Sequence, residues 1–366
     1  MNPNFWTGKR VFVTGHTGFK GSWLSLWLQE MGALVKGYSL PAPTTPSLFE
    51  EAKVWEGMST EEGDIRDFTH LRQVINDFKP EIVFHMAAQP LVRLSYDEPI
   101  ETYSTNVMGT VYLLEAVKQV GGVKAVVNIT SDKCYENREW VWGYREDEPM
   151  GGYDPYSNSK GCAELVASSY RQSFFNAEKY SEHGCALASV RAGNVIGGGD
   201  WADDRLIPDI LQAFTNNKKV EIRSPYAIRP WQHVLEPLSG YITIAEKLYL
   251  EGLSFAEGWN FGPKDEDAQP VEKIVKHLTQ SWGEGAEWFL SQEVHPHEAH
   301  YLKLDCSKAK MRLNWQPVWD LETTLDKIVS WQKAWLNGED IKTYTINEIK
   351  EYMTARAGNK ECRKSN

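Results

Sequence analysis

The sequence predicts an α/β chain built on a doubly wound parallel sheet, with a smaller mixed α/β region towards the C-terminus. Short apolar segments alternate with longer amphipathic segments over the first half of the 366 residues, which is typical of a parallel sheet with crossover helices. A glycine triplet stands between the first apolar segment and the helix expected after it. A chain of this length can bury a large core in one large or two moderate domains.

The overall composition narrows the range of partners. The net charge of −11 argues against nucleic acid or an anionic membrane as a general partner. No apolar run reaches the roughly 18–20 residues that span a bilayer, and the N-terminus has no signal-peptide pattern. The five cysteines are odd in number and form no CxxC pair, as expected for reduced thiols. We therefore expect a cytoplasmic protein.

The first strand and the loop after it form the best-defined motif of the N-terminal half. Arg10–Thr14 is a short β-branched and aromatic run, and Gly15, Gly18 and Gly21 follow it in G-x-x-G-x-x-G spacing. We expect the next helix over 23–31. Glycines at such a place let the backbone approach a pyrophosphate, whose charge the helix N-terminus attracts. A glycine triplet alone is weak, but between a strand and a helix it predicts a dinucleotide-binding, Rossmann-type domain.

The second strand, expected over 33–40, leaves the choice of dinucleotide open. Such folds usually carry an acidic residue at the end of this strand to hold the adenosine ribose, and here that place is occupied by the letters YSL. The absence of an acid weakens the prediction of NAD over NADP. Asp64, further on, either bonds the adenine amino group or caps the helix expected over 67–78.

Two further strands, expected over 81–89 and 123–130, end in residues suited to a site. A long amphipathic helix is expected between them, over 102–119. The strand expected over 81–89 ends in small residues, where a cofactor can lie close to the backbone. The second ends in Ser131-Asp132-Lys133, at the sheet edge where active sites of such folds lie. The alternative for Ser131-Asp132 is a turn or a helix cap.

Tyr156 and Lys160 lie four residues apart and therefore share one face of a helix, which we expect to reach about Phe175. An ammonium so placed can lower the pKa of the phenol, so that tyrosinate takes a proton from a sugar hydroxyl near neutral pH. The same spacing recurs by chance on many exposed helix faces. The glycine triplet and Ser131-Asp132 upstream support a catalytic role for Tyr156 and Lys160.

The chain changes character after the strand expected over 186–191. A glycine-rich loop follows, and from Arg205 onward Pro and Trp are frequent and the β/α alternation is less regular. We therefore divide the chain into a dinucleotide-binding domain over 1–190 and a mainly substrate-binding region over 191–353, with some chain crossing back. The charged tail over 354–366 is expected to fray.

The glycine loop, SDK at 131–133 and YSNSK at 156–160 make the chain similar to the extended short-chain dehydrogenases/reductases. More narrowly, it resembles the nucleotide-sugar 4,6-dehydratases over roughly residues 6–330. Longer stretches match the members that act on CDP-glucose: GHTGFKGSWL, YSLPAPTTPSLFE, TSDKCYEN, GYREDEPMGGYDPYSNSKGCAE, RAGNVIGGGDWA and RPWQHVLEPLSGY.

This resemblance implies a lyase that contains NAD in its N-terminal domain and CDP-D-glucose in its C-terminal region. The product would be CDP-4-keto-6-deoxy-D-glucose, which feeds dideoxysugars of surface polysaccharide (O-antigen). The resemblance also implies a homodimer or a tetramer, paired through the helices that begin near Thr102 and Tyr156.

The resemblance assigns a role to each residue of the cluster. Tyr156 would take the proton of the C4 hydroxyl, Lys160 would hold the nicotinamide ribose and depress the pKa of Tyr156, and Ser131 would bond the C4 oxygen. Asp132 would protonate the departing C6 hydroxyl as general acid. Many relatives carry Asp-Glu where this chain has Asp132-Lys133. The base that removes the C5 proton is therefore open between Lys133, a water and Tyr156.

Other residues match positions that contact the two ligands in relatives. On the cofactor side they are Gly15, His16, Thr17, Gly18, Phe19, Gly21, Asp64, Ile65, Ala87, Ala88, Gln89, Asn106, Thr130, Tyr156 and Lys160. On the substrate side they are Gln89, Arg93, Ser131, Asn194, Arg205, Leu206, Arg229, Asn260 and His300. His16 either loosens the cofactor, as the resemblance implies, or is a tolerated loop residue. His295, His297 and His300 have a spacing found in metal sites, but the matched chemistry needs no metal and we expect none.

Two other functions are weighed against this one. A 4-epimerase or reductase acting on a nucleotide sugar shares most of the site but needs no acid for the C6 oxygen, so Asp132 separates it from a dehydratase. A catalytically silent, NAD-binding scaffold of the same fold would not need Ser131, Tyr156 and Lys160 together. The cytosine base is implied by the resemblance alone.

Overall fold

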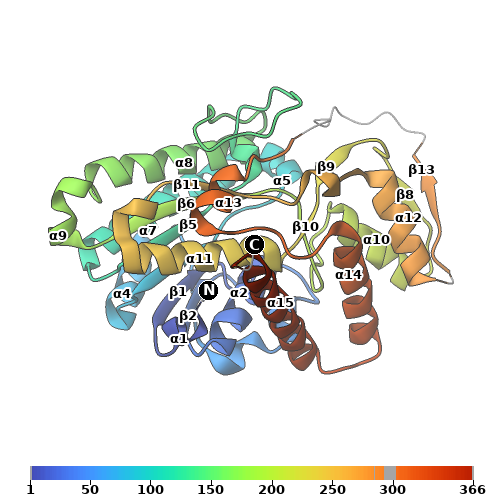
Figure 1. The fold of residues 1–366 in the computed structure, drawn as a ribbon, viewed down its shortest axis with the longest axis horizontal. Coiled ribbons are helices and arrows are strands. Elements are labelled where there is room, and N and C mark those ends of the chain that lie inside the picture. Colours follow the sequence, from blue (N-terminus) through green and yellow to red (C-terminus); the bar gives the residue numbers. More distant parts are fainter. Residues whose placement is uncertain (1, 284, 292–301, 365–366) are drawn as a thin grey trace.

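A computed structural model describes residues 2–283, 285–291 and 302–364 of the chain. In this part of the chain the centre is a seven-stranded parallel sheet in the order β11–β6–β5–β4–β1–β2–β3 (Figure 1). Its strands are β1 (Arg10–Thr14), β2 (Leu34–Ser39), β3 (Ser59–Glu62), β4 (Ile82–His85), β5 (Ala125–Ile129), β6 (Ala186–Ala192) and β11 (Gly258–Phe261). The strand order reverses between β1 and β4, and ligands of such sheets bind at this switch point. The predicted doubly wound parallel sheet is confirmed.

Helices cover both faces of the sheet, because successive strand residues point to opposite faces. Val11 and Val13 of β1 pack with α2 (Phe19–Glu30) and α11 (Leu235–Glu251), in one apolar core. Phe12 of β1 points the other way. It belongs to a second core, shared with three helices: α4 (Phe68–Phe78), α7 (Gly109–Val120) and α8 (Pro155–Ser173).

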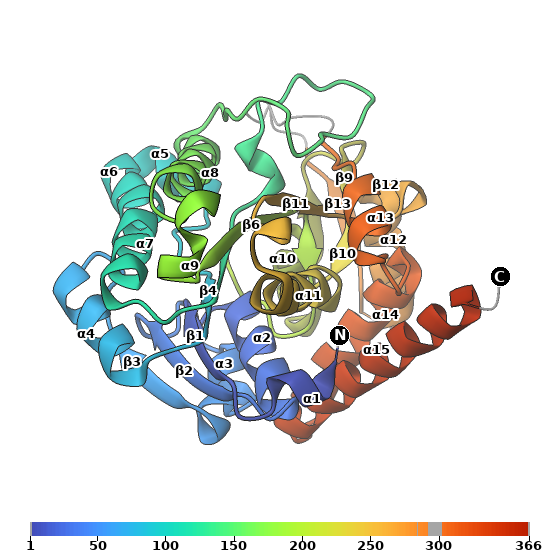
Figure 2. The same ribbon diagram turned by 60° about the vertical axis from the view of Figure 1, so that its left-hand side comes forward.

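The C-terminal region forms a third apolar core of its own. Its helices are α10 (Leu206–Thr215), α12 (Val271–Trp282) and α14 (Leu321–Leu336), and three two-stranded sheets accompany them. The strands of these small sheets are β7 (Val195–Ile196), β8 (Val220–Ile222), β9 (Ile228–Pro230), β10 (Gln232–His233), β12 (Ala268–Pro270) and β13 (Trp288–Leu290). The remaining helices are α1 (Pro3–Trp6), α3 (Leu48–Glu51), α5 (Val92–Asp97), α6 (Pro99–Tyr103), α9 (Tyr180–His183), α13 (Ser307–Leu313) and α15 (Ile341–Lys364). Because β11 and α11 return to the large sheet, the chain crosses back from this region, as Figure 2 shows.

The helix expected over 102–119 is not one regular helix. It consists of α6, a π-helical turn over Ser104–Met108, and α7. Asn106 lies in the turn and points inward, where its side chain bonds both backbone groups of Gln89. Such turns are frequent at functional sites, because the extra residue redirects a side chain.

The strand β3 was not expected, since STEE is polar and only β2 pairs with it.

The expectation that residues 354–366 fray is wrong for 354–364, which continue the helix α15. The reason is packing: Tyr352 is fully buried and makes an edge contact with Trp27 of α2, at 5.6 Å between ring centres. Lys350 of α15 also forms an ion pair with Glu30 of α2 at 3.1 Å. The last helix of the chain is therefore held against the helix that follows the glycine loop.

A buried ion pair fixes α8 to the sheet. Arg191 of β6 donates from Nε and Nη2 to the two carboxylate oxygens of Glu164 of α8, both at 2.8 Å. Both side chains are less than 5% exposed. Thr130 also donates to Glu164, and Tyr135 contacts the Arg191 guanidinium. Arg191 lowers the pKa of the Glu164 carboxyl against the opposing effect of burial.

We expect Glu164→Gln to lower the free energy of unfolding by about 3–5 kcal/mol, because it leaves the Arg191 charge buried without its counter-charge. Urea unfolding followed by circular dichroism measures the change. Glu115→Gln is the matched control, since Glu115 pairs with Lys118 at the protein surface and should cost less than about 1 kcal/mol. Equal decreases in the free energy of unfolding would show that the buried ion pair stabilises the fold no more than the surface pair does.

Candidate active site

The loop after β1 is shaped by two glycines that cannot be replaced without a clash. Gly15 has a φ of +73°, and a Cβ there would lie 2.7 Å from the backbone nitrogen of Ala87, just after β4. At Gly21 a Cβ would lie 2.1 Å from the carbonyl oxygen of Gly15. The missing side chains therefore allow the loop, the start of α2 and the end of β4 to meet closely.

Gly18 plays a different part, because a Cβ there would meet only the Gly15 carbonyl oxygen, at an ordinary 3.5 Å. It is the N-cap of α2 and provides no side-chain cap, so the first backbone N–H groups of the helix are open to an incoming anion. Residues Ala87 and Ala88 are half-buried beside this loop. These residues fit the pyrophosphate of a dinucleotide.

The His16 side chain of this loop is buried. Its ring is 2% exposed, packs edge-on against Phe49 at 5.2 Å between ring centres, and occupies the space over Gly37 that a side chain would need. Burial lowers the pKa of His16 to about 4, so the ring is uncharged at neutral pH. The ring therefore packs inside the protein. Whether His16 loosens the cofactor or is a tolerated loop residue stays a prediction.

The end of β2 has neutral polar groups where related folds have an acid. Thr17 shares a 2.8 Å hydrogen bond with Ser39 and donates to the carbonyl oxygen of Leu40. Asp64 is paired with Arg66, which lowers the pKa of its carboxyl. The cap of α4 is Asp67, whose side chain accepts from the His70 backbone N–H. Asp64 is therefore not the helix cap. Ile65 packs against Gly109, and a Cβ at that glycine would clash with it.

The structure brings Ser131, Asp132, Tyr156 and Lys160 together at the carboxyl edge of the sheet, each at most 9% exposed. Asp154 caps α8 through the backbone N–H of Ser157, and Ser95 accepts from the Tyr156 backbone N–H. The Ser131 hydroxyl donates to Asp132 at 3.0 Å.

Burial dominates the ionisation of Tyr156 and Lys160, which both lie on α8. It raises the pKa of Tyr156 to about 12, against the lowering effects of a hydrogen bond from Ser131 and the charge of Arg205. It lowers the pKa of Lys160 to about 7, helped by the neighbouring charge of Lys20. The positive groups of the protein therefore do not by themselves bring the pKa of the Tyr156 phenol near 7. That Lys160 lowers this pKa stays a prediction for the ligand-bound site.

Asp132 is the most unusual acid of the cluster. It is 3% exposed, and its Oδ2 atom has no hydrogen-bond partner among the described residues. Burial raises the pKa of its carboxyl, against the lowering effects of Lys133, Ser131 and Arg229. A carboxyl group whose pKa is raised by burial can carry a proton to a higher pH than an exposed one, which suits a general acid.

A buried chain of hydrogen bonds links the cofactor side to the catalytic helix. Thr14 accepts from the Met86 and Ala87 backbone and contacts His85 Nδ1 at 2.8 Å, and His85 Nε2 contacts the Thr110 hydroxyl at 3.1 Å. Thr110 donates to the Asn106 carbonyl oxygen. Further on, the Asn106 amide donates to Ser159, whose hydroxyl donates to the carbonyl oxygen of Tyr156 at 2.7 Å. The predicted cofactor residue Asn106 is thus linked through Ser159 to the backbone of Tyr156.

Two of the arginines expected on the substrate side, Arg205 and Arg229, lie near the cluster, since their charges act on Tyr156 and Asp132. Arg205 pairs with Asp200 at 2.9 Å and Arg93 with Asp204 at 2.8 Å. The charge of Arg229 acts on Asp132, and its Nη1 donates to the neighbouring carbonyl oxygen of Ile228.

Lys20 was not predicted, although it sits inside the glycine motif. Its charge interacts with Arg205, Asp132 and Asp200, and burial lowers its pKa to about 8. It therefore lies between the loop and the acids of the site. A lysine in the glycine motif was a sequence feature that could have indicated it.

Asn260 is not available to a substrate, contrary to the prediction. It is fully buried in β11, accepts from the Tyr135 hydroxyl at 2.8 Å, and donates to the carbonyl oxygens of Tyr144 and Asp305. Gln89 is similarly engaged, with its side chain bonded to Thr102 and to the Leu91 backbone.

The other predicted residues lie near the edge of the sheet or outside the described part. Asn194, Leu206, Phe19 and Thr130 are placed on the loops and helix starts around it. His295, His297 and His300 lie outside the described residues. Elsewhere in the described part, no three His, Cys, Asp or Glu side chains gather as metal ligands would. None of the helices described there combines the length and apolar character of a membrane span.

A doubly wound parallel sheet, a glycine loop at its switch point and a buried Ser-Tyr-Lys cluster at the carboxyl edge together define a short-chain dehydrogenase/reductase. The chain belongs to the GDP-mannose 4,6-dehydratase family, whose model matches residues 12–328. It is 71% identical to CDP-glucose 4,6-dehydratase of Salmonella typhimurium, over 97% of this chain and 99% of that protein.

Solved structures support the fold. UDP-glucose 4-epimerase of Thermotoga maritima, solved with UDP-glucose, is similar with a TM-score of 0.76 and 23% identity, over 89% of this chain and 99% of that one. dTDP-glucose 4,6-dehydratase of Bacillus anthracis, solved with NAD, is similar with a TM-score of 0.71 and 22% identity, over 89% and 97% of the two chains.

Proposed function

We propose that this protein is an NAD-dependent hydro-lyase that converts CDP-D-glucose to CDP-4-keto-6-deoxy-D-glucose. The observation that carries the proposal is Asp132, a buried carboxyl group with one unpartnered oxygen beside Ser131. Loss of water from C5 and C6 needs an acid for the C6 oxygen, whereas a 4-epimerase does not. The 71% identity to a CDP-glucose 4,6-dehydratase, over nearly the whole chain, supports the choice of nucleotide sugar.

The open glycine loop supports a dinucleotide cofactor, and a dehydratase of the same fold was solved with NAD. When bound, NAD supplies the hydride acceptor for C4 and the hydride donor for C6. Gly15 and Gly18 would hold its pyrophosphate, and Lys160 would hold its nicotinamide ribose.

Tyr156 would take the proton of the C4 hydroxyl while Ser131 bonds the same oxygen. In the ligand-free site burial keeps the Tyr156 phenol protonated, with a pKa raised to about 12. A positive charge close to the phenol lowers this pKa, because it favours the phenolate. Buried Lys160 and partly buried Lys20 are the lysines whose positive charge can have this effect while they stay protonated.

The C4 ketone acidifies the C5 proton, which a base removes. The C6 hydroxyl then leaves as water with a proton from Asp132. Return of the hydride taken from C4 to C6, and of a proton to C5, would leave the loss of one water and no net oxidation. The Ser131 side chain would orient this acid, since its hydroxyl donates to Asp132 Oδ1 and Oδ2 has no partner among the described residues. The final sugar has a methyl group at C6.

Lys133 is our proposed C5 base. Its side chain is exposed, and Nζ lies 5.9 Å from the centre of the Tyr156 ring. We expect Lys133→Ala to lower exchange of the C5 proton with solvent by about 10²–10⁴-fold, while C4 oxidation continues. Mass spectrometry of the sugar in deuterated water measures the exchange. Lys179→Ala, remote from the site, is the control, and retained exchange in Lys133→Ala would assign the step to water or Tyr156.

The function itself is tested by incubating the protein with NAD and, separately, with CDP-, dTDP-, UDP- and GDP-sugars, and following their mass. Loss of one water from CDP-glucose alone supports the enzyme, base and sugar together. Isomerisation without a change in mass would indicate an epimerase. No change with any sugar would indicate a non-catalytic scaffold.

We also propose a cytoplasmic homodimer that pairs through α6, α7 and α8, which lie side by side in Figure 2. Four apolar side chains on this side are exposed to solvent, from 37% to 84%: Ile100, Tyr103, Met108 and Leu165. Apolar groups at such density mark an interface. Sedimentation velocity distinguishes a dimer from a tetramer.

A further inference from the structure

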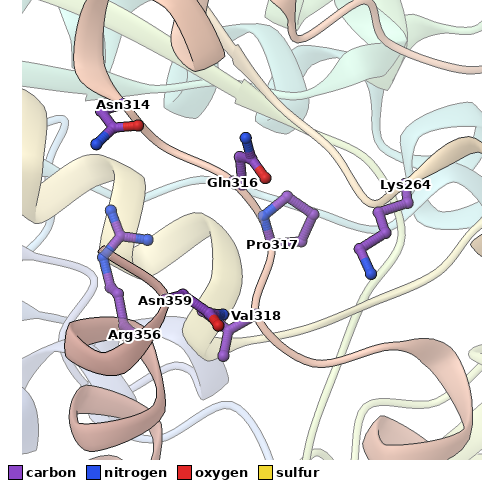
Figure 3. Close-up of a pocket in the computed structure, with 7 residues that line it drawn as sticks. All are labelled: Lys264, Asn314, Gln316, Pro317, Val318, Arg356 and Asn359. Atoms are coloured by element: carbon purple, nitrogen blue, oxygen red, sulfur yellow. The ribbon is translucent and has the colours of Figure 1, made fainter. Parts of the chain in front are cut away.

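A pocket of about 300 Å³ lies on the side of the molecule where α15 meets the segment after α13. Figure 3 shows its polar lining: Lys264, Asn314, Gln316, Arg356 and Asn359. None of these residues belongs to the catalytic cluster or to the predicted ligand contacts. The pocket adjoins α11, which covers the face of the sheet opposite to the catalytic helix α8.

Arg356 is the central observation. Its side chain is only 5% exposed, and it extends from α15 into the pocket. One nitrogen, Nη1, donates to the Ser239 hydroxyl of α11 at 3.1 Å. Nε and Nη2 have no hydrogen-bond partner among the described residues. A buried guanidinium with unused donors is costly, because the lost hydration is not replaced.

The nearest acid does not satisfy these donors. Glu236 uses Oε1 to accept from the backbone N–H groups of Val318 and Trp319, and Oε2 to accept from the Tyr352 hydroxyl. Burial raises the pKa of Glu236 to about 7, so its carboxyl is only partly charged near neutral pH. Glu236 therefore leaves Nε and Nη2 of Arg356 without a partner among the described residues.

The second cation of the pocket is Lys264, which is partly exposed and pairs loosely with Glu266 at 3.5 Å. Its charge also acts on Asp267 and Asp320. Amide side chains at 314 and 359 complete the rim. A planar guanidinium presents two parallel N–H donors, a geometry that matches the oxygen pair of a phosphate or carboxylate. The volume is at the lower end for small-molecule sites, which are about 300–1,000 Å³.

We propose that this pocket binds a small oxyanion, a phosphate or carboxylate group, through Nε and Nη2 of Arg356 with Lys264 as the second cation. The anion clamps α15 to α11 and to the 314–318 segment. Because α15 packs on α2 through Tyr352 and Trp27, occupancy stabilises the helix that carries the glycine loop.

The proposal is tested by thermal unfolding of the full chain, without nucleotide sugar, at constant ionic strength. Inorganic phosphate, citrate and CMP are titrated against potassium chloride. A ligand that binds only the folded state raises the Tm in proportion to the logarithm of its concentration. We expect Arg356→Gln to weaken the apparent affinity for inorganic phosphate by about tenfold or more, as loss of charge-assisted hydrogen bonds does.

Two controls separate this site from others. Arg312→Gln removes a surface arginine paired with Glu257 and should keep the wild-type affinity. Arg229→Gln removes an arginine of the proposed substrate site and should also keep the Tm increase. If Arg356→Gln does not fold, Lys264→Gln replaces it, with an expected severalfold loss of affinity.

The outcomes are distinct. Phosphate or CMP binding that Arg356→Gln weakens and Arg229→Gln leaves unchanged supports the site, and equal affinities for the two then show that a free oxyanion suffices. The proposal is overturned if no anion raises the Tm of the wild type, or if Arg356→Gln and Lys264→Gln respond as the wild type does. It is also overturned if the effect disappears only in Arg229→Gln, which would place the anion in the substrate site.

Discussion

Tyr156→Phe is expected to lower kcat for water loss from CDP-glucose by about 10²–10⁴-fold, because it removes the group that takes the C4 proton. The phenol lies at the buried edge of the sheet beside Ser131, and phenylalanine keeps its shape there. Single-turnover kinetics that follow the reduced nicotinamide measure C4 oxidation directly. The step that fails in Tyr156→Phe should be this first one.

Tyr170→Phe is the matched control for this prediction. Tyr170 lies on the same helix, and its hydroxyl contacts Glu115 at the surface rather than the catalytic cluster. It should therefore keep wild-type turnover. If Tyr156→Phe retains C4 oxidation, the proton goes to another group, and the assignment of Tyr156 as base is wrong.

Asp132→Asn is expected to separate the two halves of the reaction. An amide cannot donate the proton that the C6 hydroxyl needs, so water loss should fall by about 10²–10⁴-fold while C4 oxidation remains. Mass spectrometry measures the water loss, and absorbance of the reduced nicotinamide measures the oxidation. Asp67→Asn is the control, because asparagine also caps the helix α4 and leaves the site unchanged.

The pH dependence of this step has a defined sign. Burial raises the pKa of Asp132, so the acid form persists to a higher pH than in an exposed aspartate. Water loss should then slow as the pH rises through this pKa, because the acid becomes a carboxylate. An equal fall of C4 oxidation and water loss in Asp132→Asn would instead show that Asp132 acts by holding Ser131.

Local sequence patterns were enough for most strands of the sheet and for the helix that carries Tyr156 and Lys160. The β-branched run at Arg10–Thr14 and the glycines after it predicted a strand and a loop that the structure confirms. The spacing of Tyr156 and Lys160 predicted a shared helix face, and both side chains reach the buried cluster. These features depend on neighbours within a few residues, which periodicity and turn chemistry describe directly.

Tertiary structure decided what depends on residues far apart in the chain. Asn260 looked like a ligand contact, but partners from two distant segments bury its amide. The charged residues after position 353 suggested a frayed tail, but packing on α2 makes them a helix with Arg356 inside. The pKa of Tyr156 is likewise set by burial rather than by its helical neighbour. Sequence patterns report local conformation, whereas desolvation and long-range hydrogen bonds exist only once the chain has folded.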